Sequence, residues 1–231
     1  MREAIILAGG FGTRLRTVVS DVPKPMAPVA GRPFLAYLLD DLERQAYRHV
    51  VLATGYMHEK VEEYFGHRYR NLAIDYARET SPLGTGGAIV NALQHCTEER
   101  VTVLNGDTFF RIDQDLMLNA ANPEYRLMIV LRHVPNAGRY GIVEVDPQGR
   151  ITAFREKAPT VGAGLINGGI YRLDRSLLDP WKPGQPFSFE KDVLQPLCET
   201  YQAYISDTYF IDIGVPDDYA RAQTELPQFA L

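Results

Sequence analysis

The stretch AIILAGG, residues 4–10, is a continuous apolar run followed at once by two glycines. A strand buried on both faces of a parallel sheet has this pattern. Three later segments are also expected to be strands, at residues 49–54, 72–76 and 101–104. Helical apolar spacing lies between these runs, in the segment after Pro33 and at residues 58–65 and 86–95. The alternation of strand and helix predicts a parallel sheet covered on both faces.

The second half of the chain has a different pattern. Further strands are expected at residues 126–134, 168–173 and 209–213, and helices at 189–198 and 217–226. Residues 142–145 and 151–155 flank a DPQG turn with proline at its second position, which predicts a hairpin. We therefore expect one α/β domain spanning residues 1–231. Its Rossmann-like three-layer fold has a mixed, mainly parallel central sheet with antiparallel insertions.

Composition narrows the class of protein. The 231 residues carry a formal net charge of −5, which argues against the basic surface that nucleic acid requires. No apolar run approaches the roughly 18 residues of a membrane span, and the first run is too short for a signal peptide. Cys96 and Cys198 form no C-x-x-C pair, so we expect two buried, reduced thiols in a cytoplasmic protein. The five histidines lack the spacing of a zinc site.

The loop after the first expected strand carries glycines and two cations. Gly9, Gly10 and Gly12 allow a ligand to approach the backbone closely, and Arg14 and Lys24 suit phosphate oxygens. The loop matches neither the dinucleotide fingerprint nor the P-loop. A polyphosphate that needs more than one cation is one interpretation. The alternative is a glycine-rich turn with exposed basic residues.

A second glycine-rich loop, ETSPLGTGGA, covers residues 79–88. Gly84, Gly86 and Gly87 open an expected helix, for which Thr85 is a candidate N-cap. The exposed start of such a helix can bind an anion or pack against a flat base. The alternative is a flexible helix start without a ligand.

Two aspartates follow or end buried strands far apart in the chain. Asp107 comes directly after the strand at residues 101–104, and Asp212 lies between two isoleucines, where an unpaired carboxylate is costly. Two carboxylates are suitable ligands for one Mg²⁺ whose remaining positions are filled by phosphates and water. The alternatives are a turn cap for Asp107 and a structural ion pair for Asp212.

Six motifs occur in order along almost the whole chain: LAGGFGTRLR, PKPMAPVAGRP, PLGTGGA, NGDTFF, NGGIY and DIGVPDDY. In these the chain resembles the sugar-1-phosphate nucleotidyltransferases. The resemblance implies a GT-A-like fold, with residues 1–110 binding the nucleotide and 111–231 the sugar phosphate. It implies condensation of an NTP with a sugar 1-phosphate to NDP-sugar and pyrophosphate, with Mg²⁺ as cofactor, by a monomer or homodimer. Two of the motifs are most similar to members that use GTP and a manno-heptose 1-phosphate, whereas UTP, dTTP or CTP with another sugar 1-phosphate stays open.

The resemblance also assigns residues. It places nucleotide binding on Leu7, Ala8, Gly9, Gly10, Gly12, Thr13, Arg14, Lys24, Gly84, Thr85, Gly87, Asn105, Gly106 and Asp107. It places sugar binding on Tyr140, Gly141, Glu156, Lys157, Asn167 and Gly168, and metal binding on Asp107 and Asp212. The catalytic set is Arg14, Lys24, Asp107 and Lys157.

The chemistry of the reaction is compatible with these assignments. The attacking phosphate oxygen is already an anion, so catalysis is expected to come from positioning and charge stabilisation. Arg14 and Mg²⁺ would stabilise the leaving pyrophosphate, Lys24 would bridge phosphates near the α position, and Lys157 would hold the sugar phosphate. Glu156 would accept sugar hydroxyls. An exposed pair at the end of the hairpin is the alternative for Glu156 and Lys157.

Two other classes of protein and one further segment stay open. A glycosyltransferase would carry a D-x-D metal motif after a strand, and Asp113-Gln114-Asp115 has that form but looks like a helix start. A non-catalytic nucleotide-sensing subunit would be expected to lack Arg14, Lys24 or an aspartate. The segment FSFEKDV places Glu190 either at the sugar pocket or on a solvated helix start.

Overall fold

The computed structural model describes residues 1–231 except 11–18, 20 and 156–161. Within the described residues, eight strands form a central sheet in the order β13-β9-β12-β7-β1-β4-β6-β5. The parallel core consists of β7 (Arg100–Asn105), β1 (Glu3–Leu7), β4 (His49–Thr54) and β6 (Leu72–Arg78). This core and the strands beside it confirm the predicted mixed, mainly parallel α/β sheet.

Strands of the second half of the chain extend the sheet beyond β7, some antiparallel and one parallel to their neighbours. β12 (Gly164–Asp174) is antiparallel to β7 and to β9 (Leu127–Val134), whereas β13 (Gln202–Ile205) is parallel to β9. The predicted hairpin is confirmed as β10 (Ile142–Val145) and β11 (Ile151–Arg155), closed by a bond from the Gly149 N–H to the Asp146 carbonyl. The remaining strands are β2 (Pro28–Val29), β3 (Arg32–Pro33), β5 (Arg68–Tyr69), β8 (Thr108–Phe110) and β14 (Phe210–Asp212).

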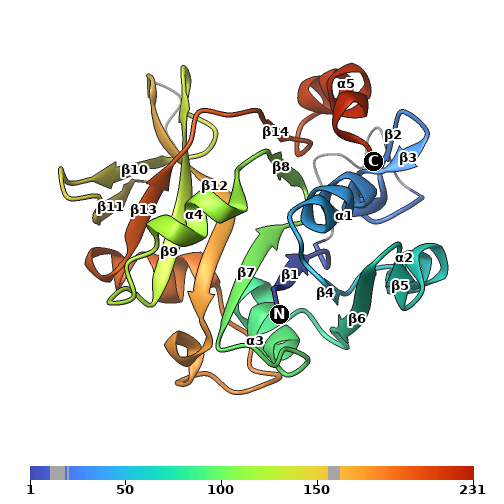
Figure 1. Ribbon diagram of the computed structural model, residues 1–231, viewed down its shortest axis with the longest axis horizontal. Helices are drawn as coiled ribbons and strands as arrows, with labels where there is room; N and C mark the ends of the chain where they lie inside the picture. Colours follow the sequence, from blue (N-terminus) through green and yellow to red (C-terminus); the bar gives the residue numbers. More distant parts are fainter. Residues whose placement is uncertain (11–18, 20, 156–161) are drawn as a thin grey trace.

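Helices cover both faces of the sheet (Figure 1). Their bounds are α1 (Phe34–Arg44), α2 (His58–Phe65), α3 (Gly84–Leu93), α4 (Gln114–Ala120) and α5 (Pro216–Glu225). Short helical turns complete the described chain: 3₁₀ helices at Lys24–Met26, Arg175–Leu178, Cys198–Thr200 and Leu226–Phe229, and a π-helix at Phe189–Leu194. The helix predicted at residues 189–198 is thus shorter than its sequence pattern indicates, because it ends at Leu194.

The alternation of side chains along β1 explains the two cores. Ala4 and Ile6 pack into a cluster with α1, α2, α4 and α5, whereas Ile5 packs into a cluster with α3 and the π-helix. All three side chains are fully buried. Because both faces of β1 are covered, its sequence is apolar without interruption. Figure 1 shows α1, α4 and α5 on one side of the sheet and α3 on the other.

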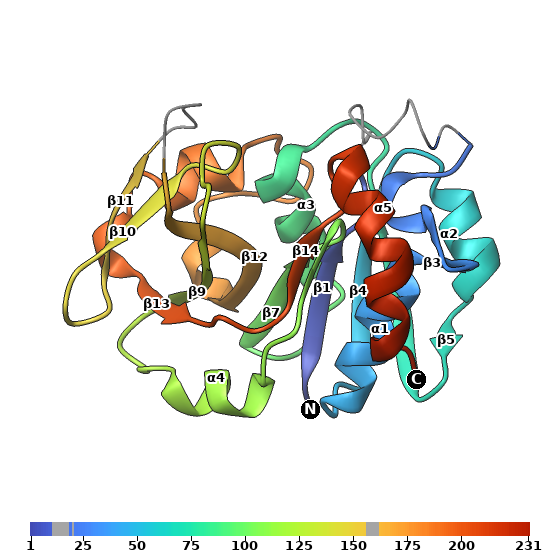
Figure 2. The ribbon, with the colours of Figure 1, turned by 90° about the horizontal axis from the view of Figure 1, so that it is seen from above.

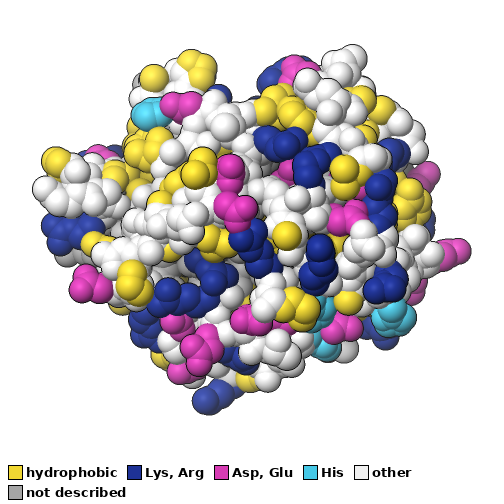
Figure 3. Space-filling model, viewed as in Figure 1, with side chains coloured by type: hydrophobic (Ala, Val, Ile, Leu, Met, Phe, Trp, Pro, Cys, Tyr) yellow, Lys and Arg dark blue, Asp and Glu magenta, His cyan; other side chains and the backbone are white. Residues whose placement is uncertain are grey.

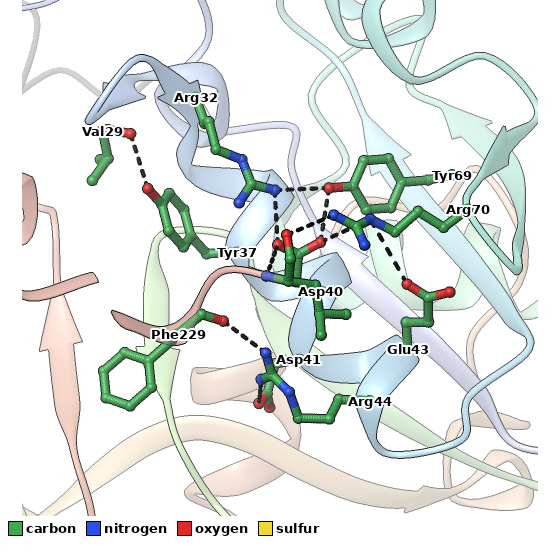
Figure 4. A network of polar contacts seen from close by, with 11 residues as sticks. Val29, Arg32, Tyr37, Asp40, Asp41, Glu43, Arg44, Tyr69, Arg70 and Phe229 are labelled. Atoms are coloured by element: carbon green, nitrogen blue, oxygen red, sulfur yellow. Dashed lines mark hydrogen bonds and ion pairs between the residues drawn. The ribbon is translucent and has the colours of Figure 1, made fainter. Parts of the chain in front are cut away.

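A buried carboxylate joins α1 to the outer strands (Figure 4). The Asp40 side chain is fully buried, and it accepts hydrogen bonds from Arg32 at 2.7 Å, from the Tyr69 hydroxyl at 2.8 Å and from the Leu231 N–H at 3.0 Å. Arg70 adds an ion pair at 3.5 Å. A buried charge is tolerated when it is paired and hydrogen-bonded in this way.

Charges of both signs are mixed on the surface of the protein. On the face shown in Figure 3, Lys and Arg side chains are interspersed with Asp and Glu. Among the described residues, no helix has the length and apolar character needed to cross a bilayer.

Both cysteines are free. The prediction that both are buried was wrong for Cys198, which is only partly covered because it begins a short 3₁₀ helix among exposed residues; its Sγ donates to the Thr152 carbonyl.

Candidate active site

A cavity of about 630 Å³ opens where the parallel strands end. Figure 2 shows β1 running upward from the N-terminus toward that edge of the molecule. The residues that follow four strands line it: Gly9 after β1, Gly55 after β4, Glu79 after β6, and Gly106 with Asp107 after β7. Ligands of open α/β sheets bind at this edge.

Lys24 lies between the two predicted metal ligands. Its Nζ donates a short hydrogen bond to Asp107 Oδ2 and lies 3.9 Å from Asp212 Oδ1. In this ion triplet, the Lys24 side chain is only 12% exposed and Asp212 22%, whereas the Asp107 carboxylate is 37% exposed and open to the cavity. Lys24 begins a 3₁₀ helix, and the preceding Pro23 has the extended conformation that directs the chain back to the cavity.

Pairing of β8 with β14 brings the two aspartates together. Asp212 is opposite Thr108, and the Ile213 N–H donates to the Asp107 carbonyl at 3.0 Å. The Gly214 N–H donates to Asp212 Oδ1 at 2.7 Å, which fixes the carboxylate. A Cβ at Gly214 would lie 2.7 Å from that oxygen and 3.0 Å from Lys24 Nζ, so a side chain there would disrupt the triplet.

The donor set fits a divalent cation. Burial and the neighbouring Asp107 charge both raise the pKa of Asp212, because they disfavour a second negative charge. The Lys24 ammonium offsets part of this repulsion, and a divalent cation at the two carboxylates would relieve the rest. Among the described residues, no three His, Cys, Asp or Glu side chains are arranged so that they could hold a metal ion, so phosphates and water would have to complete the coordination shell. That division of ligands is typical of Mg²⁺.

Glycines allow the strand ends to approach one another. A Cβ at Gly9 would lie 2.9 Å from Glu79 Oε1, and one at Gly106 would lie 2.4 Å from the Leu7 carbonyl oxygen. Gly10 has open space in front of its Cα. Of the predicted nucleotide residues, those that line the cavity are Leu7, Gly9, Gly10, Lys24, Gly84, Thr85, Asn105, Gly106 and Asp107.

The start of α3 differs from its prediction. The Thr85 hydroxyl does not cap the helix, since it accepts the Phe189 N–H at 3.0 Å. The Gly86 and Gly87 N–H groups donate to the Phe187 carbonyl at 3.1 and 3.4 Å, so these donors are occupied by the chain itself. Of the two ligands considered for this helix start, an anion is therefore not bound by these two amides. The open glycine surface at Gly84 remains part of the cavity wall.

Glu79 is a cavity residue that the sequence interpretation did not single out. One carboxylate oxygen accepts the Leu83 N–H at 3.0 Å, and the other, Oε1, lies against Gly9 with no hydrogen bond from the described residues. Burial raises the pKa of this carboxyl. Its position directly after β6, equivalent to that of Asp107 after β7, is the signal that could have identified it.

The predicted sugar-binding residues lie beside the cavity. Asn167 on β12 donates to the Tyr171 hydroxyl at 2.8 Å, and Gly168 packs so close to Phe110 that a Cβ would lie 2.5 Å from the ring. The Tyr140 ring packs edge-on against Phe210, two residues before Asp212, and the adjacent Gly141 has φ of +85°. None of Tyr140, Gly141, Asn167 and Gly168 is among the described residues that line the cavity.

An ion pair fastens the loop of Tyr140 to α5. The Arg139 guanidinium donates short hydrogen bonds to the buried Asp218 and to the Tyr140 hydroxyl, and it lies 4.6 Å from the centre of the Tyr140 ring. Arg221 pairs with the other oxygen of Asp218 at 2.8 Å. The loop is thereby held next to β14 and Asp212.

Several predicted site residues either lie outside the described residues or do not line the cavity. Gly12, Thr13, Arg14, Glu156 and Lys157 lie outside the described residues. Ala8 is buried in the sheet and Gly87 packs against the Gln185 carbonyl, so neither lines the cavity. The D-x-D segment starts α4 instead: Asp113 accepts the Leu116 N–H as N-cap and Asp115 pairs with Arg2.

Comparison with known proteins agrees with this geometry. The sequence model of the family described as Nucleotidyl transferase matches residues 3–228. The chain belongs to this family. A D-glycero-alpha-D-manno-heptose 1-phosphate guanylyltransferase of Aneurinibacillus thermoaerophilus is 45% identical over 230 residues, which are 98% of this chain and 99% of that protein. One of the same name from Campylobacter jejuni is 44% identical over 94% of this chain and 96% of its own.

A solved relative shares the fold of this nucleotidyltransferase. The crystal structure of HddC from Yersinia pseudotuberculosis complexed with GMP-PN has a TM-score of 0.86 and 35% identity, with coverage of 96% of this chain and 98% of that one. The family and the fold inferred from the six motifs are thus confirmed. The roles of individual residues remain predictions.

Proposed function

We propose that this nucleotidyltransferase transfers the guanylyl group of GTP to D-glycero-α-D-manno-heptose 1-phosphate and releases pyrophosphate. The similarity to the heptose 1-phosphate guanylyltransferases of two bacteria supports the sugar and the base. The complex of HddC with GMP-PN supports a guanine nucleotide. We place the reaction in the cytoplasm, where GTP is available.

One observation in the cavity carries the choice of base. Glu79 offers an unshared carboxylate oxygen at the end of the cavity farthest along the sheet from Asp107. The Watson–Crick edge of guanine has two adjacent donors, N1–H and N2–H, that one carboxylate can accept, whereas uracil, thymine, cytosine and adenine present no such adjacent pair. A half-buried carboxylate left without donors would penalise those bases.

The order of strands sets the order of substrates along the cavity. The base would lie beyond β4 and β6, near Glu79, and the phosphates over β1 and β7, near Gly10, Lys24 and Asp107. The sugar phosphate would then approach from β12, so residues 1–110 supply most contacts to the nucleotide and 111–231 most contacts to the sugar.

The residues of the chain then have defined roles. The sugar phosphate oxygen forms a bond to the α-phosphorus while the bond to the pyrophosphate oxygen breaks, and no proton has to be removed. Lys24 neutralises charge beside the reacting phosphates. Arg14 would neutralise charge on the leaving pyrophosphate, and Lys157 would do so on the sugar phosphate. Asp107 and Asp212 would hold Mg²⁺, which when bound supplies further charge neutralisation at the phosphates.

The test is a matrix of four NTPs against heptose, mannose and glucose 1-phosphates, read as Mg²⁺-dependent pyrophosphate release. GTP with the heptose 1-phosphate is expected to have the highest kcat/KM. Release with UTP or CTP but not GTP would refute the choice of base, and equal rates with mannose 1-phosphate would refute the choice of sugar. No release with any pair would refute the enzymatic function.

A further inference from the structure

Glu190 is an acidic side chain of the cavity that the reaction described above leaves without a role. It lies on the π-helix Phe189–Leu194 and lines the same cavity as Lys24, Asp107 and Glu79. Its carboxylate makes no hydrogen bond or ion pair with the described residues. π-helical turns are rare and occur frequently at functional sites.

The backbone that carries Glu190 is held in place from three sides. The Ser188 hydroxyl accepts the Lys191 N–H at 3.2 Å, and the Phe189 N–H donates to Thr85 at 3.0 Å. The buried Phe189 ring packs at 90° against Tyr171, with ring centres 5.4 Å apart. The backbone that presents the exposed Glu190 side chain to the cavity is therefore fixed.

The position of Glu190 along the sheet indicates which substrate it faces. Tyr171 lies on β12, which is next to β7 on the side opposite β1, β4 and β6. Burial, Glu190 and Asp107 all raise the pKa of the Tyr171 hydroxyl, so both carboxylates lie near it. Glu190 therefore lies near β12, on the side of β7 away from β1, whereas Glu79 follows β6, four strands from β12 in the sheet.

The charge of Glu190 restricts its ligand. A carboxylate repels phosphate and accepts hydrogen bonds from hydroxyls, and its two oxygens match a pair of neighbouring sugar hydroxyls. We propose that Glu190 binds ring hydroxyls of the incoming sugar 1-phosphate and thereby selects the sugar. This inference rests on the proposed function for the identity of the reaction.

The experiment compares Glu190→Gln and Glu190→Ala with the wild type. Loss of a charge-assisted hydrogen bond is expected to raise KM for the sugar 1-phosphate about 10-fold or more in the alanine variant and less in the glutamine variant, with KM for GTP unchanged. Lys191→Gln is the matched control, because it is the neighbouring exposed residue of the same π-helix and does not line the cavity. Melting curves establish that each variant is folded.

The outcomes separate this inference from the proposed function. An unchanged KM for the sugar phosphate would overturn the role of Glu190. A rise in KM for GTP instead would also overturn it, because it would assign Glu190 to the ribose of the nucleotide. If the wild type uses another NTP or sugar phosphate, the proposed substrates fail, and the same variants with that working pair decide the role of Glu190. In support, a deoxy sugar phosphate lacking the contacted hydroxyl should bind the wild type and Glu190→Ala equally.

Discussion

The two halves of the molecule build the cavity in different ways. In the first half, each parallel strand is followed directly by a residue of the cavity wall, as Gly9 follows β1 and Glu79 follows β6. In the second half, residues reach the site through distant contacts: Asp212 through the pairing of β14 with β8, and Glu190 through Thr85 and Tyr171. Residues of the first half therefore reach the cavity mainly as strand ends, whereas long-range packing brings residues of the second half to it.

The largest effect is expected where the halves meet. Asp107→Asn and Asp212→Asn should each lower kcat by about 10²- to 10³-fold, because each removes charge that would hold Mg²⁺ at the phosphates. The measurement is the Mg²⁺ dependence of pyrophosphate release. Asp115→Asn, which alters only a surface pair with Arg2, is the control. A near-normal rate for Asp212→Asn alone would show that Asp212 does not hold the metal.

The next effect tests the nucleotide side by itself. Glu79→Gln should raise KM for GTP about 10- to 100-fold, since two charge-assisted hydrogen bonds to guanine lose an acceptor. KM for the sugar 1-phosphate should stay constant, as measured by varying each substrate at saturation of the other. Because burial raises the pKa of Glu79, KM for GTP in the wild type should rise as the pH falls toward that pKa, but not in the variant. A KM for GTP that does not change with pH in either the wild type or Glu79→Gln would contradict the assignment of Glu79 to the base.

A smaller effect tests positioning on the sugar side. Arg139→Ala should raise KM for the sugar 1-phosphate about 10-fold, because the loop of Tyr140 loses its attachment to Asp218. Arg139→Lys should recover part of the loss. Arg221→Ala is the matched control, since Arg221 also pairs with Asp218 but does not contact the loop. Equal effects of both alanine variants on KM would indicate general damage to α5 instead of a role for the loop.

The smallest effect is on stability. The pKa of Asp212 is raised by burial and by Asp107, so its ionised form costs folding free energy above that pKa. Without Mg²⁺, Asp212→Asn should therefore melt at a higher temperature than the wild type at pH 7, by about 2–4 °C for each kcal/mol gained. The difference should shrink as the pH falls and vanish below the unfolded-state value of 3.8, where Asp212 is protonated in both the folded and the unfolded state. A lower melting temperature would mean that the ion pair with Lys24 outweighs the repulsion.

The same contrast explains what could be predicted from the sequence. The strand at residues 49–54 and the helix at 58–65 have the predicted bounds, because their apolar spacing is local. β13 was not predicted, since it is a four-residue edge strand with no fully buried side chain whose place depends on pairing with β9. Among candidate site residues, the predicted proximity of Asp107 and Asp212 is confirmed, because each ends or follows a buried strand.

Contacts between remote segments account for the rest. Thr85 was predicted to cap α3, and only the fold shows that the Phe189 N–H takes its hydroxyl. Glu79 looks like an ordinary polar residue until the turn after β6 buries it against Gly9. Such environments are properties of the packed chain and have no counterpart in local spacing.

The Phe187 carbonyl at the start of α3 has a consequence for dissecting this enzyme. It accepts the Gly86 and Gly87 N–H groups, and the Asp107 carbonyl accepts Ile213 N–H, so residues after 180 complete the backbone of the nucleotide side. A fragment of residues 1–110 would carry the glycine loops and Asp107 yet lack the partners that set their conformation. Fragment complementation, with the two pieces co-expressed, should restore GTP binding that neither piece has alone.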